Sequence, residues 1–219
     1  MGAPTIESLV IADPPDAWEA AGFAVDRDGT CTVGSVRLHL AGPGAGKRIV
    51  SWSLRDVPAD TTSIDGLATS VSSDPPPVRT VTHPNGVESI DHLVILSPDV
   101  DRTIAALGRA GLEPRRTRMV DATQYGFEAR QTFFRMGEVV LELIGADQPM
   151  EGAADRPAGF FGLAYTVRDL DATVALLAGH IGTVKDAVQP GRRITTLRHK
   201  QLGMSVATAF MSRGAAAIP

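Results

Sequence analysis

The segment Ser89-Ile-Asp-His-Leu-Val-Ile-Leu-Ser-Pro-Asp-Val-Asp-Arg-Thr103 changes character in its middle, and this change decides the fold. Its first half is apolar and β-branched, which is typical of a strand. Ser97-Pro-Asp99 then interrupts the run and supplies a helix cap, with Pro near the first turn. Apolar side chains at Val100, Ile104 and Leu107 follow at helical spacing. The segment therefore predicts a strand that leads directly into an amphipathic helix.

The same pattern occurs again further along the chain. Val167-Arg-Asp-Leu-Asp-Ala-Thr-Val-Ala-Leu-Leu177 aligns without a gap on Ser97 to Leu107. The N-terminal part carries a third copy, because Thr5-Ile-Glu-Ser-Leu-Val-Ile11 aligns on Ser89 to Ile95. Val33 to Gly42 aligns in the same order on Met136 to Gly145. Ile49 to Val57 looks like the opening strand of a fourth, reduced copy. Matches in the same order indicate an internal repeat.

Each full copy continues after its helix with three extended segments, which in the middle copy are 113–119, 129–136 and 139–144. The sequence thus predicts an α+β fold of repeated βαβββ modules. We expect a reduced N-terminal module with the remnant of a further one over 1–77, a linker over 78–87 and a module over 88–146. A linker over 147–158, a module over 159–213 and a tail over 214–219 complete the predicted organisation.

The composition excludes several classes of function. The formal net charge is −4, and Lys and Arg are scattered along the chain, which argues against nucleic acid as a partner. No stretch approaches the roughly 20 apolar residues of a membrane-spanning helix. Cys31 is the single cysteine, so no disulfide framework of a secreted protein is expected. These features and an N-terminus unlike a signal peptide predict a cytoplasmic protein without membrane contact.

A βαβββ unit that opens with Ile90-Asp-His-Leu93 and closes with Gly137-Glu-Val-Val-Leu-Glu-Leu143 resembles the module of the vicinal oxygen chelate superfamily. This superfamily includes glyoxalases, bleomycin-resistance proteins and extradiol dioxygenases, and the chain is similar to its bacterial glyoxalase-like members of unassigned reaction. The resemblance implies paired modules that form a cupped mixed sheet around a pocket. It also implies that His92 and Glu142 occupy the metal-ligand positions of the first and fourth strands.

The predicted metal site is incomplete. Strand alternation turns His92 and Glu142 to the same side of the sheet, where they could hold zinc, manganese, nickel or iron. The matching positions of the last module are Gly162 and Thr208, which are not strong ligands. His39 and His199 are candidate third ligands. A site without any metal is an equally consistent interpretation.

The remaining candidates are residues expected to line the pocket and bind a ligand. Aromatic side chains suit a mainly apolar pocket, and an inward arginine suits a carboxylate or phosphate. The chain is therefore expected to bind a small apolar or aromatic metabolite without a complete metal site, and a homodimer is left open. The alternative is a metal-dependent lyase, isomerase or dioxygenase. The candidate ligand-binding residues are Gln131, Phe133, Tyr165, Arg193 and Thr208.

Overall fold

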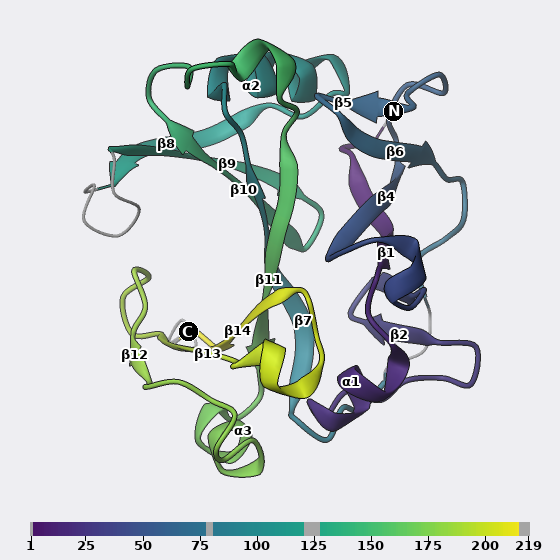
Figure 1. The fold of residues 1–219 in the computed structure, drawn as a ribbon, viewed down its shortest axis with the longest axis vertical. Coiled ribbons are helices and arrows are strands. Elements are labelled where there is room, and N and C mark those ends of the chain that lie inside the picture. The colour runs from purple at the N-terminus through teal and green to yellow at the C-terminus, as the bar shows by residue number, and fades with distance from the viewer. Residues whose placement is uncertain (1, 78–80, 121–127, 215–219) are drawn as a thin grey trace.

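The computed structural model describes residues 2–77, 81–120 and 128–214, and in this part of the chain the strands form two sheets (Figure 1). The predicted linker over 78–87 and tail over 214–219 lie partly outside the described residues. Among the described helices, none is long and apolar enough to cross a membrane.

The N-terminal half forms a six-stranded sheet in the order β2-β3-β1-β4-β6-β5. Its only α-helix in the described residues is the short α1, and a 3-10 turn (Pro43–Ala45) precedes β4. The elements are β1 (Thr5–Ile11), α1 (Pro15–Ala20), β2 (Thr30–Val33), β3 (Val36–Leu40), β4 (Ile49–Arg55), β5 (Ser63–Ile64) and β6 (Leu67–Val71).

The C-terminal half forms an eight-stranded sheet in the order β12-β13-β14-β11-β7-β10-β9-β8. Among the residues that the structure describes, two helices and two 3-10 turns (Ala153–Asp155 and His199–Leu202) accompany it. The elements are β7 (Val87–Leu96), α2 (Val100–Arg109), β8 (Pro114–Val120), β9 (Ala129–Met136), β10 (Val139–Ala146), β11 (Gly159–Val167), α3 (Leu170–Leu176), β12 (Lys185–Asp186), β13 (Arg193–Thr196) and β14 (Ala207–Ser212).

The two sheets share one scheme of strand pairing. In the first, β1 pairs parallel with β3 and antiparallel with β4, which pairs parallel with β6. In the second, β7 pairs parallel with β10 and antiparallel with β11, which pairs parallel with β14. The pairings follow the sequence matches, since β1 corresponds to β7 and β4 to β11. The predicted α+β fold of repeated βαβββ modules is confirmed, with the N-terminal copies shortened.

The repeated aspartates of the sequence are helix caps. The Asp99 carboxylate accepts a hydrogen bond from the backbone N–H of Arg102 at 3.0 Å. The Asp169 carboxylate accepts from the N–H groups of Asp171 and Ala172 at 3.0 and 3.1 Å. Each cap satisfies backbone donors that the first turn of a helix leaves without partners. This explains why the helix-start pattern recurs in the same place after β7 and β11.

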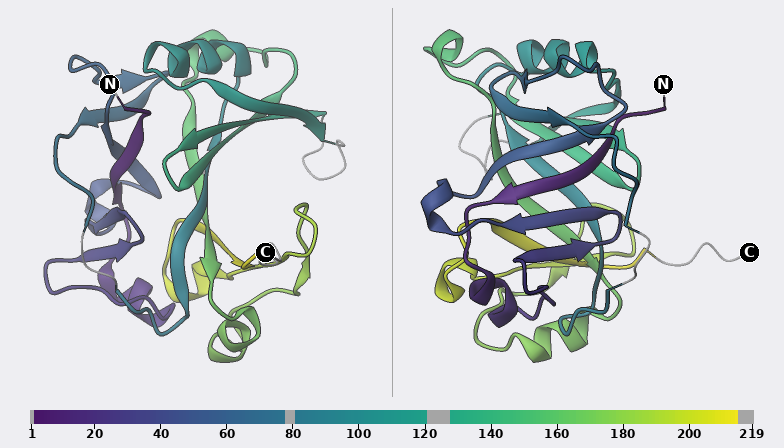
Figure 2. Two further views of the ribbon diagram at one scale, coloured as in Figure 1. Left: turned by 180° about the vertical axis from the view of Figure 1, so that it is seen from behind. Right: turned by 90° about the vertical axis from the view of Figure 1, so that its right-hand side faces the viewer.

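A single apolar core joins the sheets. The six-stranded sheet packs against the outer face of the eight-stranded sheet, which curls so that β8 and β12 form the rims of an open cup (Figures 1 and 2). The Trp52 ring of β4 lies 5.3 Å from the Phe160 ring of β11, and Phe23 lies 5.1 Å from Tyr165. The inner face of the cup is therefore the one face of this sheet that the core does not use.

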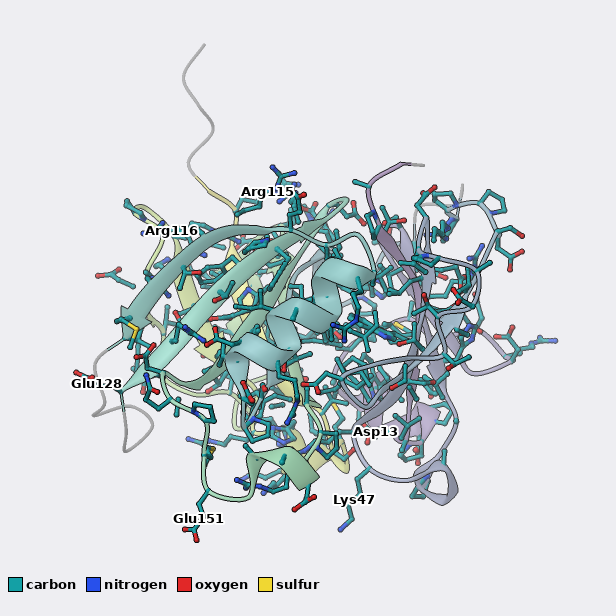
Figure 3. The ribbon with its side chains drawn as sticks, turned by 90° about the horizontal axis from the view of Figure 1, so that it is seen from above. Asp13, Lys47, Arg115, Arg116, Glu128 and Glu151 are labelled. Atoms are coloured by element: carbon teal, nitrogen blue, oxygen red, sulfur yellow. The ribbon has the colours of Figure 1, made fainter. Side chains whose placement is uncertain are left out.

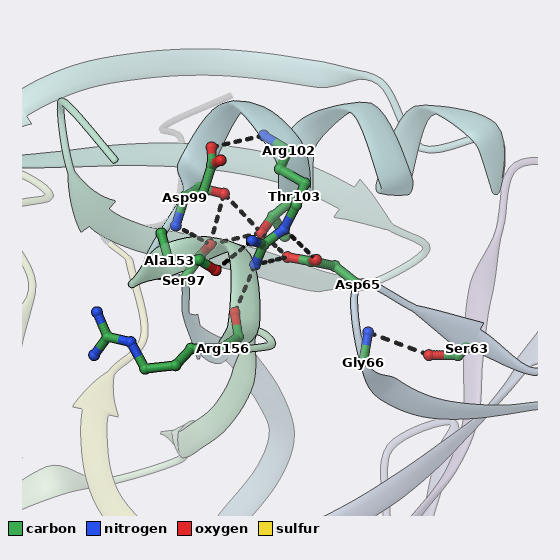
Figure 4. Close-up of polar contacts among 9 residues, drawn as sticks. All are labelled: Ser63, Asp65, Gly66, Ser97, Asp99, Arg102, Thr103, Ala153 and Arg156. Carbon is green, nitrogen blue, oxygen red and sulfur yellow. Dashed lines mark hydrogen bonds and ion pairs between the residues drawn. The ribbon is translucent and has the colours of Figure 1, made fainter. Parts of the chain in front are cut away.

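Two polar clusters also tie the halves together. Arg102 of α2 donates to both carboxylate oxygens of Asp65, at 2.6 and 3.3 Å, and to the carbonyl oxygens of Ala153 and Arg156 (Figure 4). Asp65 sits in the Asp65-Gly66 turn between β5 and β6, where both residues have positive φ, as tight hairpin turns require. An aspartate at the tip of this hairpin thereby anchors the first sheet to α2.

The second cluster is centred on His83, which is buried between the halves. Its Nδ1 accepts from the Ala24 N–H at 3.0 Å, and its Nε2 lies 3.0 Å from the Thr32 carbonyl oxygen. These partners define a neutral ring with the proton on Nε2. Burial lowers the pKa of His83, which the Thr32 carbonyl offsets only in part.

Candidate functional site

His92 of β7 and Glu142 of β10 meet on the inner face of the cup. In the parallel β7–β10 pair, Val140 lies opposite His92 and Glu142 lies opposite Val94, so these residues share one face. The neighbouring residues Leu93 and Leu141 point into the core on the other side. The His92 Nε2 lies 3.6 Å from the Glu142 Oε2. The structure thus brings together the two residues that the sequence analysis paired.

A β-bulge adds Asp91 to this site. Ala164 is paired with His92 and Tyr165 with Ile90, so Asp91 has no partner of its own on β11. The Asp91 Oδ1 lies 2.9 Å from the His92 Nδ1. Strand alternation alone places neighbouring residues on opposite faces, and the bulge is the reason that sequence reasoning missed Asp91 as a partner of His92.

Arg192 completes the network from the segment before β13. Its Nη2 lies 2.6 Å from the Asp91 Oδ2 and donates to Thr166 Oγ1 at 3.1 Å. The Arg192 Nε donates to the Ser212 carbonyl oxygen at 2.8 Å, and Thr166 Oγ1 donates to Asp91 at 3.0 Å. Asp91 is therefore held by a guanidinium, a hydroxyl and an imidazole, which fixes the orientation of the His92 ring.

The two carboxyl groups of the site have opposite electrostatic environments. Burial alone would raise the pKa of Asp91, but hydrogen bonds from His92 and Arg192 outweigh it and lower this pKa to about 2. Burial raises the pKa of Glu142, and the nearby positive charges of His92 and Arg118 offset this only in part. Asp91 is thus a permanent anion, whereas Glu142 holds a proton more readily than an ordinary glutamate.

The geometry between His92 and Glu142 requires a positive group between them. With its Nδ1 proton directed at Asp91, a neutral His92 turns the lone pair of Nε2 towards the Glu142 carboxylate. Two lone pairs at 3.6 Å repel each other unless a proton or a cation lies between them. Two ligands of one tetrahedral zinc ion lie roughly 3.4 Å apart. The pair therefore fits either a shared proton or two ligand positions of a divalent metal.

Gln131 and Phe133 lie beside this pair. Both belong to β9, where Gln131 lies opposite Ile144 and Phe133 opposite Glu142, so they share the inner face. Arg118 of β8 donates to Gln131 Oε1 at 2.6 Å, and its guanidinium lies 5.3 Å from the centre of the Phe133 ring. These two candidate ligand-binding residues are therefore at the site, and Arg118 joins them from the edge strand.

The other three candidate ligand-binding residues lie on the opposite face, which corrects their expected placement. Tyr165 and Thr208 share the face of Leu163 and Phe210, in the core side of the sheet. Arg193 is exposed and pairs with Asp171 at the start of α3, at 2.9 Å. The sequence alignment of β14 on β10 placed Thr208 at the position of Glu142. In the structure Thr208 is paired with Leu163, one residue away from that position, so its side chain faces the core. The inward arginine of this segment is Arg192, its neighbour.

Neither candidate third ligand joins the pair. His39 lies between the core residues Leu38 and Leu40 and so faces away from the second sheet, with its Nδ1 3.3 Å from Thr30 Oγ1. His199 lies in the 3-10 turn before β14. Among the described residues, no three His, Cys, Asp or Glu side chains are arranged to hold a metal ion. Within the described residues the donor set is thus two ligands, one fewer than catalytic zinc sites usually have.

Gly162 faces the inner side of the cup and has no space for a side chain. A Cβ atom there would lie 2.3 Å from the carbonyl oxygen of Ala207 on β14. The position that the sequence aligned with His92 is therefore closed by the neighbouring strand. A metal-binding side chain at this position would require β14 to move.

The described fold and site define an α+β protein of two βαβββ-type sheets with a polar site on one cupped face. Residues 91–196 match the family described as "Glyoxalase/Bleomycin resistance protein/Dioxygenase superfamily". No curated protein sequence matches the chain. The predicted resemblance to the vicinal oxygen chelate superfamily is thus confirmed by the match over residues 91–196.

Solved structures share the fold of the whole chain. A mutant 4-hydroxymandelate synthase from Streptomyces coelicolor has a TM-score of 0.64 and 14% identity, over 98% of this chain and 94% of that chain. A "xylose isomerase-like TIM barrel/4-hydroxyphenylpyruvate dioxygenase fusion protein" has a TM-score of 0.63 and 14% identity, over 98% of this chain and 49% of that one. A methylmalonyl-CoA epimerase from Mycobacterium tuberculosis is 19% identical, over 59% of this chain and 91% of its own, with a TM-score of 0.47.

Proposed function

We propose that this protein binds a small organic molecule on the inner face of the cup, with an apolar or aromatic part against β7, β9 and β10 and a polar part at His92, Glu142 and Arg118. The observation that carries the proposal is the presence, on one sheet face outside the main core, of a polar network next to a separate apolar cluster.

The apolar cluster supports an apolar part of the ligand. Val94, Ala129 and Ile144 form a small buried cluster with Val120, distinct from the core between the sheets. Phe133 lies on the same face, opposite Glu142. Ligand pockets usually combine such apolar walls with a few polar groups that fix orientation.

The polar groups support a ligand with an acceptor or an anionic group. Within the described residues Arg118 has no carboxylate partner, and it is held in place by Gln131 and the Phe133 ring. Glu142 with its raised pKa can donate a proton as well as accept one. A ligand oxygen between Arg118 and Glu142 would therefore find a charged donor on one side and a hydrogen-bonding carboxyl on the other.

A divalent-metal-dependent enzyme of the lyase, isomerase or dioxygenase type is the second candidate. It is favoured by the separation of 3.6 Å between His92 and Glu142 and by the contact of Asp91 with the other ring nitrogen. Metal-binding histidines commonly donate that second N–H to a carboxylate. A bound metal would act as a Lewis acid on vicinal oxygens of a ligand. His92 and Glu142 would be its ligands among the described residues, and Asp91 would orient His92.

Two measurements on protein purified without chelators or a histidine tag test these proposals. Titration with benzoate, followed by ¹⁵N–¹H NMR, should shift amides of β7, β9 and β10, and Arg118→Met should weaken binding about tenfold, as expected for loss of a charged hydrogen bond. Arg115→Met on the exposed side of β8 is the matched control. Stoichiometric metal that is lost in His92→Ala would favour the enzyme. If the purified protein contains no metal, and if neither benzoate nor other aromatic acids shift the amide signals of the cup, both proposals fail.

A further inference from the structure

A second hollow lies away from the cup, where β4 and β6 of the first sheet meet the start of β11. It has two adjacent parts of about 430 Å³ and about 420 Å³, and Lys47 and Arg48 line both of them. Figure 3 shows Lys47 at this edge of the protein, with its side chain directed outward. Phe160, which lines the first part, points away from the inner face of the cup, so the two sites are separate.

The second part of the hollow is positively charged. Lys47, Arg48 and Lys200 line it, and within the described part of the chain none of them has a carboxylate partner. Asp13 is the acidic group nearby, but its two carboxylate oxygens accept hydrogen bonds from Trp18 Nε1 and the Ser205 N–H at 3.1 and 2.7 Å. Burial lowers the pKa of His199, and Lys200 and Arg48 lower it further. Three cations thus line this part of the hollow, and the carboxylate of Asp13 is already engaged by other donors.

Arg48 is held in a costly backbone conformation at this place. Its φ is +61°, and of the three non-glycine residues with positive φ it is the only one that is not an aspartate, within the described residues. Its N–H donates to Ser205 Oγ at 2.7 Å and its carbonyl oxygen accepts from the Ala12 N–H at 2.8 Å. Glycine would adopt this conformation without strain, and strained residues of this kind cluster at ligand-binding positions. The strained backbone at Arg48 therefore suggests that the arginine side chain itself has a function at this position.

The first part of the hollow is apolar. Its wall is formed by Ile49, Leu67, Ala158 and Phe160. At the border, the Arg48 guanidinium lies 5.9 Å from the centre of the half-exposed Phe161 ring. A molecule that spans both parts would meet an apolar wall at one end and three cations at the other.

We propose that this hollow is a second ligand site for an organic anion, in which a phosphate or carboxylate group binds at Lys47, Arg48 and Lys200 and an apolar group occupies the space against Phe160. Arg48 lies between the two parts and contacts both ends of such a ligand. This site is independent of the ligand proposed for the cup.

Phenyl phosphate is the first probe, with inorganic phosphate and phenol as its two halves. We expect phenyl phosphate to bind more tightly than either half, with an affinity that falls as salt concentration rises. Arg48→Gly should weaken binding at least tenfold while the melting temperature stays equal or rises, because glycine relieves the strained backbone. A purely structural Arg48 would instead lower the melting temperature on substitution. Benzoate binding that Arg48→Gly weakens would show that this site also accepts a carboxylate, because Arg48 lies outside the cup.

Matched variants locate the binding. Lys200→Met should weaken phenyl phosphate binding, whereas Lys185→Met, which removes an exposed cation from β12, should leave it unchanged. Equal affinity of the Arg48→Gly protein, or no binding of any of these anions, would each overturn the proposal.

Discussion

Nη2 of Arg192 lies 2.6 Å from Oδ2 of Asp91, and this contact fastens the segment before β13 to the bulge of β7 on the inner face of the cup. Both side chains are largely shielded from solvent. The contact therefore stabilises the closed curvature of the sheet as well as the orientation of His92.

Asp91→Asn should leave the Arg192 guanidinium without its charged partner. We expect a loss of about 3 kcal/mol in the free energy of unfolding, measured by urea denaturation at neutral pH. The double variant Asp91→Asn with Arg192→Met should lose less than the sum of the two single variants. Strict additivity would show that the two side chains do not act on each other.

The same carboxylate predicts an acid-dependent loss of stability. Its pKa is about 2 in the folded protein against 3.8 in the reference state, so the unfolded chain binds the proton first as pH falls. The stabilisation of at most about 2 kcal/mol is complete above pH 3.8 and is lost towards pH 2. Asp91→Asn should show a flatter fall of stability over this window than the unchanged protein.

Glu142→Gln should raise stability at neutral pH when no metal or ligand is present. Burial raises the pKa of Glu142 above 4.5, so the folded state keeps a proton that the unfolded chain has released. The free energy of unfolding therefore falls as pH rises above 4.5, and the glutamine variant should not show this fall. Urea denaturation at pH 4 and pH 7 with EDTA present measures it. If the difference in unfolding free energy between the two proteins is no larger at pH 7 than at pH 4, the prediction is wrong.

His83 should make stability depend on pH in the opposite sense. Its pKa is lowered by burial, so protons bind preferentially to the unfolded chain below pH 6.5. The melting temperature should fall from pH 7.5 to pH 5, and this dependence should be smaller in His83→Ala. The variant should also lose about 2 kcal/mol, because the Ala24 N–H and the Thr32 carbonyl lose their partner. A His83→Ala protein with an unchanged pH profile would rule out this role.

A glycine substitution in β11, compared with a control substitution in α2, tests how closely β11 and β14 approach each other. Gly162→Ala places a Cβ atom 2.3 Å from the Ala207 carbonyl oxygen, so we expect a loss of about 2 kcal/mol or more. Gly108→Ala is the matched control, since that glycine lies in α2 with no atom within 4 Å of an added Cβ. It should gain about 0.5–1 kcal/mol through helix propensity. Thermal unfolding of both variants measures the contrast, and equal effects would contradict the geometry.

Arg102→Met should weaken the link between the first sheet and α2. The variant leaves the buried Asp65 carboxylate with only the Thr103 hydroxyl and should lower unfolding free energy by about 3 kcal/mol. Both tryptophans lie in the first half, so fluorescence reports on that half and circular dichroism on both. Because one core spans the sheets, we expect the two signals to change together in both proteins. Separate transitions in the unchanged protein would show independent halves.

The fold was predictable because its signals are local. Asp99 and Asp169 cap the helices after equivalent strands, and the strand predicted over 129–136 coincides with β9. The shared orientation of His92 and Glu142 was also predictable, because side chains alternate regularly along β10 and along β7 from His92 onward.

The rest of the site depends on features that alternation does not contain. The bulge at Asp91 and the phase of β14 decide which side chains enter the cup, so Asp91 and Arg192 were missed and Thr208 was misplaced. Arg118 lies on the strand at the rim of the sheet, and local sequence does not reveal that its side chain turns inward to Gln131. The position of Arg48 depends on contacts with the distant Ser205 and Phe161, which no local pattern reports.

The burial of Phe23 against Tyr165 and Phe210 limits how this protein can be divided. A fragment that starts at residue 81 would retain the cup, but the outer face of its sheet would expose aromatic and aliphatic side chains to solvent. Such a surface associates with other copies of itself. Engineering of the cup as an isolated binder would therefore have to replace Leu163, Tyr165 and Phe210 with polar residues before the fragment could remain monomeric.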